Sequence, residues 1–210
     1  MSSKKFCVLA CAVLCLALCA AGAAFGADKG ELKRMSIFIS NFTEVGLFNF
    51  DLEEGEADDD EPLHFGSNNA ALLAFGINHN AINNKKLIKK ASLKANGITY
   101  DRAVDAKTVA ASVRKYFDLP VEHEDAIDQY GQQYPYRKGL YYFRAADGEE
   151  VIYADVQKVS KKGKVITMRG ELYNVEDKSD KRGTFVATAK PHKWNGKDTW
   201  AILSMSSELD

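Results

Sequence analysis

Several features that would narrow the function are missing from this sequence. All four cysteines of the 210-residue chain lie at or before Cys19, so the rest of the chain has no disulfide, no cysteine nucleophile and no thiolate zinc site. It also contains no Gly-x-Ser-x-Gly elbow, no phosphate-binding loop and no dinucleotide fingerprint. These absences argue against a classical enzyme of these kinds, but do not exclude an enzyme built from scattered residues.

The sequence also lacks an excess of charge of either sign. Its formal net charge is −1, and without Lys4 and Lys5 it has 26 basic residues against 29 acidic ones. This balance gives no reason to expect nucleic acid as a partner, and weak acidity gives no attraction to an anionic membrane.

Only the N-terminus carries a long apolar run. Lys4 and Lys5 precede an uncharged stretch over residues 6–26 that ends in small residues, the pattern of a secretory signal peptide. We therefore expect a signal peptide over residues 1–27, a single domain over 28–210, and a secreted or periplasmic protein. A retained membrane anchor is one alternative, and a lipid on Cys19 is another, although Leu18 departs from the lipoprotein cleavage box.

The C-terminal third has the alternation of half-buried strands. In its clearest run, Ile166, Met168, Gly170 and Leu172 alternate with Thr167, Arg169, Glu171 and Tyr173. Similar runs cover residues 140–145, 151–159, 184–190 and 199–205. We predict an antiparallel meander of four or five strands, with a longer connection over 191–198.

Helical patterns precede this meander. Apolar residues recur at spacings of three and four over residues 31–45 and 106–117, and a shorter helix is expected over 70–75. Ser67 and Asp105 are the expected N-caps. The fold class is therefore α+β, with N-terminal helices packed on one face of the meander.

The acidic stretch over residues 51–61 has two interpretations. Clustered carboxylates can bind calcium, but the spacing does not match a helix–loop–helix calcium loop. We expect a solvated loop, and predict neither a metal site nor a cofactor.

Two groups of polar residues are candidate ligand-binding sites. His79 and Asn83, in an asparagine-rich run, would share one face of a helix; the alternative is a polar cluster that satisfies its own helix end. Tyr130, Tyr134 and Tyr136 lie in a connector without clear periodicity, and we expect them to rim a groove that contacts a glycan or protein. Good strand-forming residues are the alternative there.

Two resemblances bear on class. Residues 39–44 and 73–80, Ile-Ser-Asn-Phe-Thr-Glu and Leu-Ala-Phe-Gly-Ile-Asn-His-Asn, resemble segments of uncharacterised secreted or lipid-anchored bacterial proteins, a resemblance that implies no function. Helices followed by a meander of long strands resemble the cystatin-like and nuclear-transport-factor-like folds, which host enzymes and binders alike.

The sequence thus favours a non-enzymatic binding module of the bacterial cell envelope, with no predicted catalytic residue. Its partner would be an extracellular or envelope protein or glycan. The alternative is a small cofactor-free hydrolase- or isomerase-like enzyme with a pocket near His79.

Overall fold

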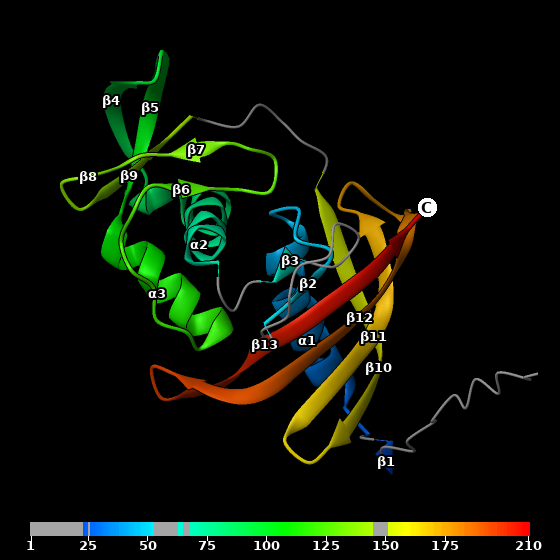
Figure 1. Ribbon diagram of the computed structural model, residues 1–210. Helices are drawn as coiled ribbons and strands as arrows, with labels where there is room; N and C mark the ends of the chain where they lie inside the picture. Colours follow the sequence, from blue (N-terminus) through cyan, green and yellow to red (C-terminus); the bar gives the residue numbers. More distant parts are fainter. Residues whose placement is uncertain (1–22, 25, 53–62, 65–67, 145–150) are drawn as a thin grey trace, which may run out of the picture.

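The computed structural model describes residues 23–24, 26–52, 63–64, 68–144 and 151–210 and shows an α+β protein, as predicted. Most of the predicted signal peptide, most of the acidic stretch and the predicted cap Ser67 lie outside these residues. Figure 1 shows the long strands of the meander with one helix beside them, and a second group of helices and strands at the other end of the molecule.

The predicted meander is present and has four long strands. They are β10 (Ile152–Lys162), β11 (Val165–Asn174), β12 (Asp177–Trp194) and β13 (Lys197–Leu209). Three two-residue strands extend the same sheet: β1 (Ala23–Ala24), β2 (Phe50–Asp51) and β3 (Leu63–His64). The predicted long connection over residues 191–198 is wrong. Strand β12 continues to Trp194, and the tight turn at Asn195-Gly196, with φ of 49° and 75°, leads straight into β13.

The described part of the run over residues 140–145 does not join the meander, so the meander has four long strands of the predicted four or five. The run forms β9 (Leu140–Phe143) in a second sheet of order β4-β5-β9-β8, with β4 (Lys89–Ala95), β5 (Ile98–Asp105) and β8 (Tyr136–Arg137). A short hairpin, β6 (Ala126–Ile127) with β7 (Gln133–Tyr134), lies nearby. The chain order of strands does not say which sheet each one enters, because pairing depends on partners distant in sequence.

The described residues form three α-helices, α1 (Lys29–Thr43), α2 (Asn69–Asn83) and α3 (Ala106–Phe117), with a 3₁₀ turn η1 (Lys85–Leu87) after α2. Asp28 and Asn68 cap α1 and α2 through their side chains. Asp105 occupies the predicted N-cap of α3 but makes no side-chain cap bond. Its carboxylate pairs instead with Lys89 at 2.8 Å.

Two hydrophobic clusters meet at α2. The first fills the space between α1 and the inner face of the meander, where Ile166, Met168 and Leu172 are buried as predicted. The second joins the other side of α2 to the second sheet and α3. Helices α2 and α3 approach closely at Gly76, where an added Cβ would lie 2.8 Å from Val109 Cγ1. Only α1 therefore lies along the meander in the way the sequence predicts, since α2 and α3 also cover the second sheet.

Candidate functional site

An open groove runs along the seam between α1 and β10, with a volume of about 700 Å³. Side chains from α1, α2, β10, β11 and β12 line it, among them Ile37, Asn41, Glu44, Asn83, Tyr153 and Tyr173. Its lining mixes aromatic rings, amides, carboxylates, lysines and an exposed aliphatic side chain. A concave surface with a few converging polar groups is the usual form of a ligand site.

The base of the groove is a row of hydroxyls on α1 that hydrogen-bond the outer edge of β10. The pairs are Ser36 Oγ with Val156 N at 2.9 Å, Ser40 Oγ with Ala154 N at 3.0 Å, and Thr43 Oγ1 with Ile152 O at 2.6 Å. Both serines donate their own hydrogen to a helix carbonyl four residues earlier, which leaves a lone pair to accept from the strand. Over this stretch α1 takes the place that a neighbouring strand would have.

At one end of the groove, Glu44 is held by residues from two other elements. Asn83 Nδ2 donates to Glu44 Oε2 at 2.8 Å, and Tyr153 also hydrogen-bonds this carboxylate. Burial raises the pKa of Glu44, while these two hydrogen bonds act in the opposite direction. The result is a half-buried carboxylate fixed in position between α1, α2 and β10.

His79 and Asn83 share one face of α2, as the sequence predicts, and Asn83 Nδ2 lies 3.3 Å from His79 Nδ1. The imidazole itself is 4% exposed. It stacks on Phe75 at 5.7 Å and meets Tyr116 edge-on at 4.8 Å. Burial and the nearby Lys115 charge lower the pKa of His79 to about 4, so the ring is neutral at pH 7. His79 is therefore a buried ring that reaches the groove only through Asn83.

A second polar chain leads from the groove into the protein. Lys115 Nζ donates to the Tyr116 hydroxyl at 2.9 Å, and that hydroxyl donates to Asn41 Oδ1 at 2.9 Å. Burial raises the pKa of Tyr116 and lowers that of Lys115. Asn41 and Asn83, the two amides at the groove, are thus each oriented by buried partners.

The opposite wall consists of side chains on the outward face of β10 and β11. Tyr153 lies directly across from Tyr173 in the strand register, and their rings meet edge-to-face at 6.2 Å. Lys178 Nζ lies 5.2 Å from the centre of the Tyr173 ring and 3.1 Å from Asp155 Oδ2. These contacts hold two tyrosine rings at the groove without burying either one completely.

Tyr130, Tyr134 and Tyr136 do not form the predicted rim. Pairing of β6 with β7 turns Tyr134 into the second cluster, where it is 1% exposed and its hydroxyl lies 2.7 Å from Asp128 Oδ2. Tyr136 is half-buried and stacks on His123 at 5.4 Å. Tyr130, at 69% exposure, is the one of the three that stands in solvent.

The groove residues that sequence reasoning missed are Glu44, Asn41 and Tyr173. Strand alternation does place Tyr173 on the outward face of β11, and this signal could have drawn attention to it. Nothing local indicates that Glu44, near the end of α1, meets Asn83 at the end of α2, because they are 39 residues apart.

Within the described part of the chain there is no cluster of three or more His, Asp or Glu side chains that could hold a metal ion. None of the helices in that part is long and apolar enough to cross a membrane. Comparison with protein-family models, curated proteins and solved structures gave no match. The groove itself is therefore the feature from which a function can be inferred.

Proposed function

We propose that this protein is a non-enzymatic binding module of the bacterial cell envelope, secreted or periplasmic, and that the α1–β10 groove binds a glycan. The observation that carries the proposal is the groove, whose lining brings Tyr153 and Tyr173 together with the amide of Asn83 and the carboxylate of Glu44. Tyrosine rings pack against apolar C–H faces while their hydroxyls stay hydrated. Amides and carboxylates bind hydroxyl groups well. The proposed compartment depends on the N-terminal sequence.

A glycan fits the groove better than a peptide does. An extended peptide commonly binds by adding a strand to a free sheet edge. Here α1 hydroxyls already occupy the outer edge of β10 at Ala154 and Val156. A ligand must therefore be recognised through side chains, as a saccharide is.

The enzyme alternative receives less support from the geometry. A general base works best with a pKa near the working pH, whereas the pKa of His79 is lowered to about 4. Its ring is also enclosed by Phe75 and Tyr116 rather than exposed in the groove. The open form of the groove suits retention of a ligand more than the exclusion of water from a reaction.

The test is a glycan array probed with the processed protein, followed by calorimetry on the best ligand. Tyr173→Ala should weaken binding by about 1 kcal/mol or more, the scale of an aromatic contact residue. Tyr173→Phe, which keeps the ring, should retain most of it. Tyr130→Ala is the matched control, because Tyr130 is exposed but lies outside the groove.

Two outcomes would refute the proposal. The first is glycan binding that is unchanged in Tyr173→Ala. The second is turnover of a bound substrate that disappears in His79→Gln, which would favour the enzyme.

A further inference from the structure

The charges of this nearly neutral chain are unevenly distributed. Between residues 82 and 107 there are seven basic side chains and two acidic ones. The rest of the chain therefore carries a net charge of −6, for a total of −1. In salt, charges act over roughly 10 Å, so a partner at this surface responds to the local excess and not to the total. The whole-chain balance, which gave no attraction to an anionic membrane, is misleading here.

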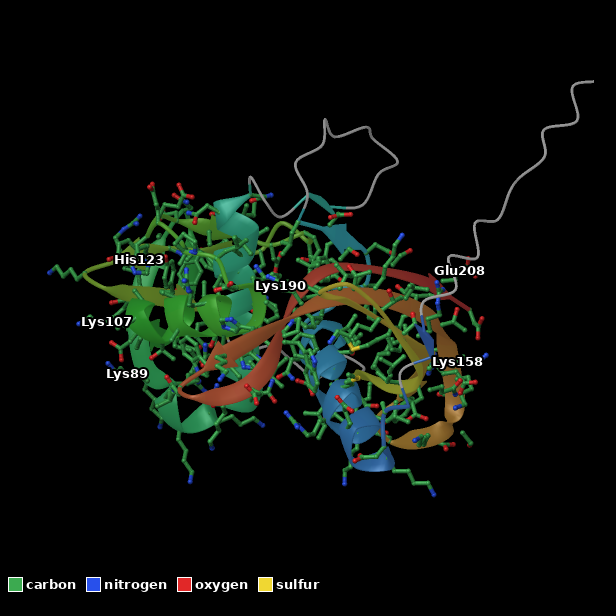
Figure 2. The ribbon with its side chains drawn as sticks, turned by 90° about the horizontal axis from the view of Figure 1, so that it is seen from below. Lys89, Lys107, His123, Lys158, Lys190 and Glu208 are labelled. Atoms are coloured by element: carbon green, nitrogen blue, oxygen red, sulfur yellow. The ribbon has the colours of Figure 1, made fainter. Side chains whose placement is uncertain are left out.

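Four of these basic residues and two exposed apolar side chains follow one another along the segment from the end of α2 through η1 into β4. We name this surface the α2–β4 patch, formed by Ile82, Lys85, Lys86, Leu87, Lys90 and Lys94. All six side chains are exposed. Leu87 and Ile82 are 49% and 38% exposed and are five residues apart in the chain. Figure 2 shows Lys89, which is adjacent to the patch, at the same end of the molecule as Lys107. Lys158 and Glu208 lie at the other end.

The nearby acidic residues Asp101 and Asp105 form ion pairs with residues outside the patch. Lys89 pairs with Asp105, and Asp101 pairs with Arg102. Among the described residues, no ion pair involves Lys85, Lys86, Lys90 or Lys94. Lys90 also lies directly across the β4–β5 register from Arg102, whose guanidinium is paired with Asp101. The four patch lysines are therefore the charges that an anionic partner would meet.

We propose that the α2–β4 patch binds the surface of an anionic lipid membrane, with Leu87 and Ile82 inserted at the headgroup level and the lysines against the phosphates. This pairing of basic and apolar side chains is the pattern of proteins that lie on membranes. A soluble polyanion would account for the lysines but not for the exposed Leu87. None of the six patch residues lines the groove, so the two proposals can fail independently.

Flotation with lipid vesicles tests this proposal. The protein should float with vesicles containing phosphatidylglycerol and not with phosphatidylcholine alone, and raised salt should release it. One lysine near an anionic surface strengthens binding by about fivefold. Changing Lys85, Lys86, Lys90 and Lys94 to Gln should therefore weaken binding by several hundredfold, on the order of the product.

The matched control replaces four exposed lysines elsewhere, Lys158, Lys162, Lys164 and Lys197, with Gln. It makes the same change in net charge and should leave binding within a few-fold of the original. A thermal melt establishes that both quadruple variants remain folded. Equal losses in the two variants would overturn the proposal, because binding would then follow total charge.

Leu87 distinguishes a lipid surface from a soluble polyanion. Leu87→Ser should weaken vesicle binding by roughly tenfold, since it removes the inserted aliphatic chain. Leu87→Trp should bind and show a blue shift in emission on phosphatidylglycerol vesicles. If Leu87→Ser is silent and polyphosphate competes fully for the protein, the patch is a polyanion site and the membrane proposal is wrong.

Discussion

Tyr134 and Tyr130 offer a sharp test of the structure, because they are four residues apart and differ strongly in burial. Tyr134 is 1% exposed, and its hydroxyl lies 2.9 Å from Asn78 Oδ1 and 2.7 Å from Asp128 Oδ2. Tyr130 is 69% exposed. From the sequence alone, both were expected to be contact residues with little role in the core. We now expect the same substitution to have opposite consequences at the two positions.

Tyr134→Ser removes a buried ring and leaves its space to be filled by neighbours that can relax only in part. Truncation of a large aromatic core residue costs about 3–5 kcal/mol of unfolding free energy. For a domain of this size each kcal/mol lowers the melting temperature by about 2–4 °C, so we expect a fall of about 6–20 °C. Tyr130→Ser, a change at the surface, should cost less than about 1 kcal/mol.

The assay is urea unfolding at equilibrium, followed by circular dichroism, with thermal melts in parallel. Both variants should show a single cooperative transition, with the midpoint strongly lowered only for Tyr134→Ser. If the two variants differ by less than about 1 kcal/mol, the burial assigned to Tyr134 is wrong. That result would favour the prediction from sequence that the connector tyrosines are ligand-contact residues at a groove.

Two further predictions concern pH and the core strand. Burial keeps the folded-state pKa of His79 at about 4, below its ordinary value of 6.5, so protonation favours unfolding. The free energy of unfolding therefore has its full value above pH 6.5 and decreases by on the order of 3 kcal/mol as the pH falls toward 4. Over that pH range the unfolding free energy of His79→Gln should decrease less than that of the original protein. If urea unfolding gives the same pH dependence for both proteins, this prediction is wrong. In β11, Leu172→Ala should cost about 2–5 kcal/mol and Arg169→Ala, on the exposed face, less than about 0.5; similar losses would mean that the two faces are assigned wrongly.

The parts of the fold that the sequence predicts are those with a local cause. Apolar spacing and a cap position were enough for α3, which runs over residues 106–117 as predicted. Alternation was enough for the faces of β11. The sequence does not predict the second sheet, because neither β4 nor β5 has a clear alternation of polar and apolar residues. Strand β4 is rich in lysine, and β5 has polar and apolar residues on each face.

The sequence predicts only the part of the candidate site that lies on a single helix, α2. His79 and Asn83 meet because they are four residues apart on α2. The carboxylate that completes their end of the groove comes from Glu44, and the ring opposite comes from Tyr153. Contacts over such separations follow from tertiary packing, which a single sequence does not display. The tyrosine connector failed for a related reason, since the pairing of β6 with β7 decided which ring turned inward.

The hydroxyl row between α1 and β10 has a consequence for the order in which the chain folds. Its two serine contacts join residues 114 and 120 positions apart. Long-range contacts of this kind form slowly, because the chain loses the entropy of closing a large loop before any stabilising contact forms. An isolated helix of 15 residues is only marginally stable in water. Helix α1 is synthesised early but is stabilised by β10, which is synthesised late. The groove between them therefore forms only after β10 has been made and the two segments have come together.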